Sequence, residues 1–120
     1  MKILIVDDEP DIRKLHRYLL ISHQHDVIEA GNGEEAMQIF NEDFSTIDLV
    51  VLDLTMPVMD GMQAFEEMRA KKPELKVLLI TGFDDLWDLN KIVNQEGVRF
   101  LKKPFHVDAF LDAINELLQD

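Results

Sequence analysis

The sequence contains no cysteine, which excludes disulfides and thiolate metal sites and suits a reducing compartment. Basic residues are few, with 12 Lys and Arg against 24 Asp and Glu, and the net charge of -12 opposes binding to nucleic acids or anionic lipids. Long apolar runs are also missing. The first run, Ile3 to Val6, is far shorter than a signal sequence, and no later run approaches the roughly 20 residues of a membrane span. We therefore expect a cytoplasmic protein without membrane contact.

The 120 residues, 47% of them hydrophobic, predict one domain over residues 1–120. Short apolar runs at strand length alternate with amphipathic segments at helix spacing. The predicted strands are Ile3 to Val6, Val27 and Ile28, Asp48 to Leu52, Val77 to Ile80 and Val98 to Leu101.

Each of these strands is followed by a predicted helix. The inward-facing residues are expected to be Ile12, Leu15 and Leu19 after Pro10; Ala36, Ile39 and Phe40 after an Asn32 N-cap; Phe65 and Met68 between Gly61 and Pro73; Leu89, Ile92 and Val93 between about Asp84 and Gln95; and Phe110, Ile114 and Leu117 after Pro104. This (βα)5 alternation predicts an α/β fold of the doubly wound kind, with a parallel sheet covered by helices on both faces.

Reactive side chains follow four of the predicted strands. Asp7 and Asp8 follow the first strand, Asp53 the third and Thr81 the fourth, while Lys103 lies close behind the fifth. Because ligands of such folds bind at the carboxyl ends of the strands, we expect these side chains to converge at one edge of the sheet.

The chemistry of this set can be derived from its charges. Asp7, Asp8 and Asp53 together carry more negative charge than Lys103 balances, so they require a neutralising partner. Mg²⁺ meets this need, because it binds carboxylate oxygens and keeps positions for water and phosphate. A carboxylate beside Mg²⁺ and an ammonium is a nucleophile suited to phosphorus, which predicts an aspartyl phosphate.

Four segments in the same order strengthen this interpretation: Ile3 to Pro10, Asp53 to Gly61, Thr81-Gly82 and Phe100 to Phe105. Together they resemble the receiver domain of two-component response regulators over the whole chain. The resemblance implies a flavodoxin-like sheet in the order 2-1-3-4-5. It also implies a signalling switch rather than an enzyme, one that assists its own phosphorylation and dephosphorylation.

The resemblance further assigns roles to residues. Asp53 would be the phosphoacceptor, and Asp8, Asp53 and the main-chain carbonyl of Thr55 would ligate Mg²⁺, with Asp7 acting through water. Lys103 would pair with the phosphoryl group and would precede a cis peptide bond to Pro104. Thr81 and Phe100 would form the switch pair that converts phosphorylation into a changed surface.

Partners also follow from the resemblance: a sensor histidine kinase or phosphotransfer protein as donor, and an output protein or domain as receiver of the signal. Phe83, Leu86 and Trp87 would add apolar surface to the face used by such partners. That surface predicts either an output contact or homodimer, or simple packing against neighbouring atoms. Thr55 and Phe83 would also tune the lifetime of the phosphoryl group, with Phe83 slowing its hydrolysis.

The four histidines are candidate metal ligands. His23 and His25 lie in the loop before the second strand, His16 on the first helix and His106 near the last helix. Without further ligands nearby, we expect all four to be solvated side chains.

Two other functions remain open on the residues. A haloacid-dehalogenase-like phosphatase also uses an Asp nucleophile after a hydrophobic strand, but it requires a second Asp two residues later, where this chain has Thr55. A scaffold that works without phosphorylation is the other alternative, which the intact set of Asp8, Asp53, Thr81 and Lys103 disfavours.

Overall fold

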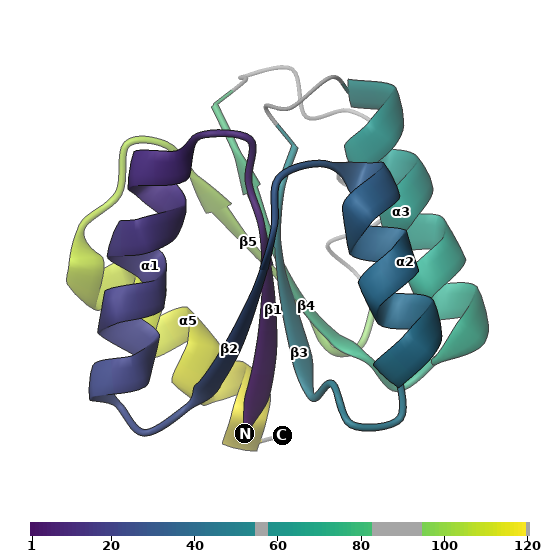
Figure 1. Ribbon diagram of the computed structural model, residues 1–120. Coiled ribbons are helices and arrows are strands. Elements are labelled where there is room, and N and C mark those ends of the chain that lie inside the picture. Colours follow the sequence, from purple (N-terminus) through teal and green to yellow (C-terminus); the bar gives the residue numbers. More distant parts are fainter. Residues whose placement is uncertain (55–57, 83–94, 120) are drawn as a thin grey trace.

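The computed structural model describes residues 1–54, 58–82 and 95–119, and strands alternate with helices along them (Figure 1). The strands are β1 (Lys2–Val6), β2 (Asp26–Ala30), β3 (Leu49–Asp53), β4 (Lys76–Thr81) and β5 (Val98–Lys102). The helices are α1 (Pro10–Ser22), α2 (Gly33–Asp43), α3 (Val58–Lys71) and α5 (Val107–Gln119). The predicted helix from about Asp84 lies, except for Gln95, outside the described residues.

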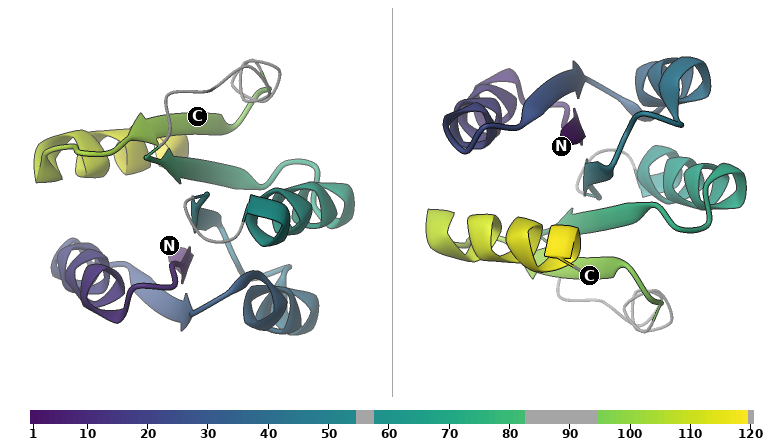
Figure 2. Two further views of the ribbon diagram at one scale, coloured as in Figure 1. Left: turned by 90° about the horizontal axis from the view of Figure 1, so that it is seen from above. Right: turned by 90° about the horizontal axis from the view of Figure 1, so that it is seen from below.

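All neighbouring strands pair in parallel, in the order β2-β1-β3-β4-β5, which confirms the predicted topology. Helices α1 and α5 cover one face of the sheet and α2 and α3 cover the other, as the two end-on views show (Figure 2). The strand order reverses direction between β1 and β3, and that crevice is where such sheets bind ligands. None of the helices in the described part of the chain is long and apolar enough to cross a membrane.

The apolar core consists of two layers because the central strands are hydrophobic on both faces. In β1, Leu4 and Val6 pack toward α2 and α3, whereas Ile3 and Ile5 pack toward α1 and α5. Strand β3 repeats this alternation, and all five of its residues are buried. Asp53 therefore lies at the end of a fully buried strand.

The predicted inward faces of α3 and α5 are confirmed. Phe65 and Met68 are buried on α3, as are Phe110, Ile114 and Leu117 on α5. The predicted N-cap is also present, because the side chain of Asn32 accepts a hydrogen bond of 2.8 Å from the Glu35 amide.

The predicted face of α1 is wrong in one position. Leu15 is 47% exposed, and His16 and Leu20 are buried instead. The helix turns the stripe through residues 12, 16, 19 and 20 toward the sheet, because the space beside α5 holds aromatic rings that accept the flat imidazole of His16.

Several element boundaries also differ from the prediction by one or more residues, most of all those of β2 and α3. Strand β2 runs from Asp26 to Ala30, and α3 begins at Val58, before Gly61 rather than after it. A Cβ at position 61 would lie 3.1 Å from the Leu54 side chain and 3.5 Å from the Asp53 carbonyl oxygen. Glycine there lets the first turn of α3 approach the end of β3 closely.

Candidate functional site

Parallel pairing brings the predicted reactive residues to one end of the sheet. Val6 is in register with Leu52, so Asp7 and Asp53 follow matched positions on β1 and β3. Thr81 ends β4 in register with Lys102, the residue before Lys103. Asp7, Asp53 and Thr81 are almost completely buried, whereas Asp8 is exposed at the start of the following loop.

The three carboxylates form a cluster. Asp7, Asp8 and Asp53 each offer an oxygen, and these oxygens all lie within 4.8 Å of one another. A set of hard oxygen donors, two buried and one facing solvent, fits Mg²⁺, which takes few carboxylates and keeps water in its remaining positions. Thr55, the fourth predicted ligand, lies outside the described residues.

Lys103 provides the positive charge at this cluster. Its Nζ donates a hydrogen bond of 2.9 Å to Oδ2 of Asp53, and its backbone N–H donates one of 2.7 Å to the Thr81 carbonyl. Burial alone would lower the pKa of Lys103, but the hydrogen bond to Asp53 and the nearby carboxylates raise it. The Lys103–Pro104 peptide bond is cis, as the resemblance implied.

Asp7 is a buried carboxylic acid whose surroundings strongly perturb its ionisation. Burial raises its pKa to about 6, the Glu9 amide that donates to its Oδ1 opposes this shift, and the charge of Asp53 adds to it. Keeping the carboxylates of this site ionised therefore costs free energy, and an added cation would lower that cost.

Comparison with known proteins supports the same interpretation. Residues 3–115 match the family described as the response regulator receiver domain. The chain belongs to this family. It is 35% identical over 117 residues to the transcriptional regulatory protein GlrR of Escherichia coli, covering 98% of this chain and 26% of that protein. It is 32% identical to the chemotaxis protein CheY of Listeria monocytogenes, covering 97% of both.

Solved structures agree with this assignment. The response regulator protein TrrA from Thermotoga maritima, in complex with Mg²⁺ and BeF, superposes with a TM-score of 0.82 at 32% identity, covering 97% of each chain. The receiver domain described here spans only about a quarter of the transcriptional regulator GlrR but nearly all of CheY. Its acidic cluster is typical of the family site, and receiver domains generally act as phosphoacceptor switches.

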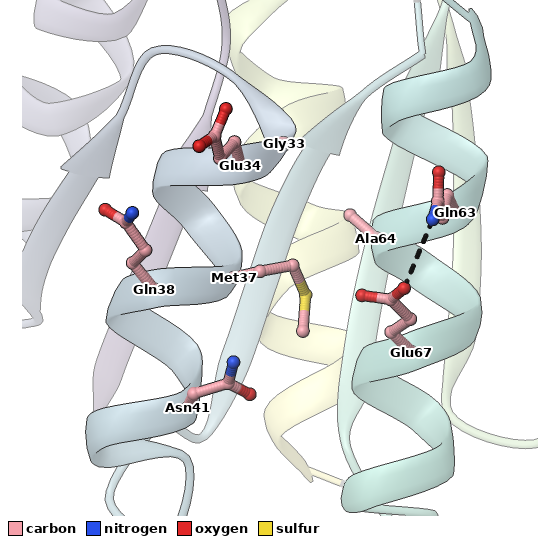
Figure 3. Close-up of a pocket in the computed structure, with 8 residues that line it drawn as sticks. All are labelled: Gly33, Glu34, Met37, Gln38, Asn41, Gln63, Ala64 and Glu67. Carbon is pink, nitrogen blue, oxygen red and sulfur yellow. Dashed lines mark hydrogen bonds between the residues drawn. The ribbon is translucent and has the colours of Figure 1, made fainter.

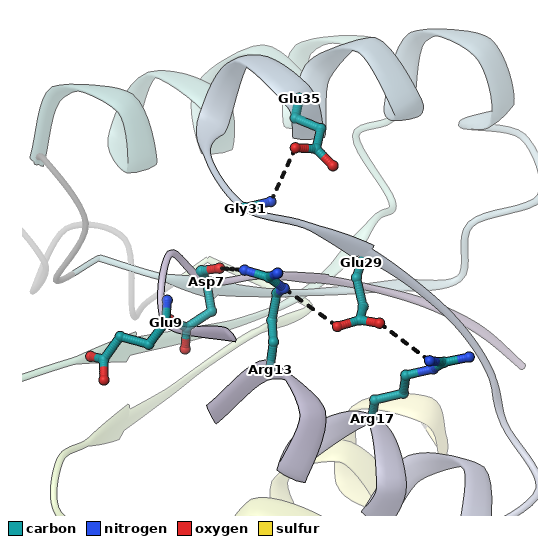
Figure 4. Close-up of polar contacts among 7 residues, drawn as sticks. All are labelled: Asp7, Glu9, Arg13, Arg17, Glu29, Gly31 and Glu35. Carbon is teal, nitrogen blue, oxygen red and sulfur yellow. Dashed lines mark hydrogen bonds and ion pairs between the residues drawn. The ribbon is translucent and has the colours of Figure 1, made fainter. Parts of the chain in front are cut away.

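Sequence reasoning missed a polar network that fixes the acidic loop of this receiver domain (Figure 4). Arg13 on α1 donates from Nη1 to the Asp7 carbonyl over 2.6 Å and from Nε to Glu29 on β2 over 3.3 Å. Glu29 also pairs with Arg17 at 3.5 Å. No local sequence signal could have revealed this, because the partners come from three separate segments.

The prediction for His16 is wrong, since only 5% of this residue is exposed. Its ring stacks on Phe110 with centroids 4.3 Å apart and lies 6.1 Å from that of Phe105. Burial lowers its pKa to about 4, with a further contribution from the charge of Lys103 that the charge of Asp53 partly opposes. An apolar neighbourhood thus keeps the imidazole neutral.

The other histidines are more ordinary. His23 and His106 are exposed as predicted, and a ring nitrogen of His23 lies 2.9 Å from the Leu19 carbonyl. His25 is half-buried rather than solvated, and burial lowers its pKa. The residues described contain no metal-binding group of three or more ligands that includes a histidine.

Phe100 lies on β5, half-buried against the core layer that α2 and α3 cover. Phe83, Leu86 and Trp87, the predicted partner surface, lie outside the described residues.

A separate groove of about 340 Å³ lies between α2 and α3, with Met37 and Ala64 among the residues that line it (Figure 3). It contains none of the predicted site residues.

Proposed function

We propose that Asp53 accepts a phosphoryl group from a sensor histidine kinase or phosphotransfer protein and that the modified chain then controls an output partner. The observation that carries this proposal is the pairing of a buried carboxylate with an ammonium: Asp53 is 1% exposed and lies 2.9 Å from Nζ of Lys103. A buried acid aligned with a cation at the switch point of a doubly wound sheet is arranged for reaction at a phosphate.

The residues divide the chemistry between them. An oxygen of Asp53 forms a bond to phosphorus while the bond from phosphorus to the donor atom breaks, and the donor leaves with that electron pair. Lys103 pairs with the phosphoryl oxygens as charge moves onto them. Asp8, Asp53 and the Thr55 carbonyl would hold Mg²⁺, with Asp7 acting through water. The bound ion supplies positive charge to the carboxylates and the phosphoryl group.

The signal would pass through Thr81 and Phe100. The hydroxyl of Thr81, buried at the end of β4, would move to donate to a phosphoryl oxygen, and Phe100, now half-buried on β5, would turn inward. This would change the face formed by the predicted fourth helix, β5 and α5, which we propose as the contact for an output protein, an output domain or a second copy. The proposal places this exchange in the cytoplasm, which suits a chain without cysteine.

The test is incubation with a small acyl phosphate donor and Mg²⁺, followed by mass spectrometry. One phosphoryl adduct is expected, stable in acid and labile in base as an acyl phosphate is. The adduct should disappear in Asp53→Asn and persist in Asp112→Asn, a change of the same kind at an exposed acid of α5.

The same experiment separates the two alternatives. Rapid turnover of many phosphoesters would favour the phosphatase, and the absence of any adduct would favour the phosphorylation-independent scaffold.

Binding of output partners and self-association are then compared between Trp87→Ala and the unchanged chain, both phosphorylated. Equal behaviour would remove Trp87 from the proposed contact.

A further inference from the structure

Three aromatic rings from separate segments stack against each other beside the phosphorylation site. His16 comes from α1, Phe105 from the loop between β5 and α5, and Phe110 from α5. The centroids lie 4.3 Å apart for His16 and Phe110, 6.1 Å for His16 and Phe105, and 6.2 Å for Phe105 and Phe110, with interplanar angles of 18°, 28° and 16°. These distances and nearly parallel planes are those of favourable ring contacts.

The presence of a histidine in this stack calls for an explanation. The rest of this core layer is apolar, and His16 is the ring that touches both phenylalanines from the α1 side. Its Nδ1 is buried with no hydrogen-bond partner among the described residues, which costs stability. A neutral ring suits the location, because burial disfavours the protonated imidazole, and a protonated ring would also repel the ammonium of Lys103, an effect that Asp53 partly opposes.

One ring of the stack, that of Phe105, closely follows Lys103 in the chain. On one side, the backbone N–H of Lys103 is held by the Thr81 carbonyl at the end of β4. On the other side, Phe105 is only two residues away, with Pro104 between them, and it is the first side chain of this loop that packs into the core layer. The position of the Lys103 side chain therefore depends on where Phe105 is seated.

We propose that His16 is a positioning residue for Lys103: its ring fixes Phe105 against Phe110 and so holds the loop that presents the ammonium to Asp53. The proposal rests on the function proposed for Asp53 and extends it to α1, which covers the same face of the sheet as α5 (Figure 2). It is the flat aromatic ring, rather than proton transfer, that performs this role.

The first test compares variants for the rate of Asp53 phosphorylation by the acyl phosphate donor at saturating Mg²⁺. His16→Ala is expected to slow the reaction about tenfold, since a small displacement of a positioned group costs that much or more. His16→Phe restores a flat ring and is expected to stay near the unchanged chain. His16→Leu fills the space without a flat ring, folds without a cavity, and is expected to be slower than His16→Phe.

Three controls separate positioning from general damage. Leu20→Ala removes a buried side chain from the same helix and the same core layer but leaves the three stacked rings in place, and it should leave the rate within about twofold. The affinity for Mg²⁺, measured by calorimetry, should also change by less than about twofold in His16→Ala, because the acidic cluster lies at the ends of β1 and β3 and not on the stacked rings. In a Lys103→Met background, His16→Ala should have no further effect on the rate.

The placement of Lys103 is also followed directly, by NMR detection of hydrogen exchange at its Nζ, which should accelerate in His16→Ala and not in His16→Phe. This readout needs no phosphorylation, so a chain that forms no adduct would refute the function of Asp53 without deciding the role of His16. An unchanged rate and unchanged exchange in His16→Ala would overturn the proposal. So would an equal loss of rate in Leu20→Ala, in His16→Phe or in the Lys103→Met background.

Discussion

Asp7 and His16 are both buried beside the same pair of charges, and burial drives both toward their neutral forms. The pKa of Asp7 is raised to about 6 and that of His16 is lowered to about 4. Because one group is an acid and the other a base, the same cause has opposite consequences for stability as pH changes.

Asp7→Asn is expected to stabilise the metal-free chain at neutral pH. The pKa of Asp7 is raised in the fold, so its contribution to stability is present below about pH 4 and is lost as pH rises through about 6. The difference corresponds to roughly 3 kcal/mol. Urea unfolding with a chelator present should show the variant more stable above pH 6 and equal to the unchanged chain near pH 4. Equal stability at both pH values would contradict the burial of a charged Asp7.

His16→Phe should show the opposite dependence. The pKa of His16 is lowered in the fold, so its favourable contribution is complete above about pH 6.5 and is lost as pH falls toward 4. The stability advantage of the variant should therefore grow by roughly 3 kcal/mol between pH 7 and pH 4. Unfolding curves at several pH values measure this, with Leu20→Ala as a control whose difference should not vary with pH. A constant difference for His16→Phe would show that the imidazole titrates normally.

At the scale of elements, the alternation of short apolar runs with amphipathic segments was sufficient to predict every strand and each described helix. The order of strands came from the family resemblance, and the structure confirmed it. The prediction was wrong on the inward face of α1. Hydrophobicity predicted that Leu15 is buried, whereas His16 is buried because its ring packs against neighbouring aromatic rings. Side-chain spacing predicts a helix, but the partner surface decides its rotation.

The N-cap of α2 provides a test at this scale. Asn32 accepts a hydrogen bond from the Glu35 amide, and a carboxylate oxygen of Glu35 accepts one of 3.5 Å from the Gly31 amide in the loop before the helix. Asn32→Ala should lower the free energy of unfolding by about 1 kcal/mol, and Asn32→Asp should largely preserve it. Phosphorylation should be unaffected in both variants, because α2 contributes no group to the site. A loss of phosphorylation equal to that of Asp53→Asn would contradict this separation.

At the scale of the molecule, the net charge of -12 and the acidic cluster lead us to expect that a bound cation stabilises the fold. Mg²⁺ at 100 times its dissociation constant should raise the free energy of unfolding by about 2.7 kcal/mol, since a cation that the folded site binds and the unfolded chain does not would stabilise the fold by mass action. Thermal unfolding in MgCl₂, compared with NaCl at matched ionic strength, measures the gain in stability that is specific to Mg²⁺. Asp8→Asn should lose most of this specific gain. An equal gain in NaCl would show that salt only screens the overall charge.

The sequence by itself determined the strands and their reactive ends, because a buried strand and the polar residue that follows it are neighbours along the chain. It therefore supplied Asp7, Asp8, Asp53, Thr81 and Lys103 as one candidate site. Only the tertiary structure decided the Arg13 network, the raised pKa of Asp7 and the burial of His16. Each of these depends on dehydration and on distances between segments far apart in the chain, which no local pattern records.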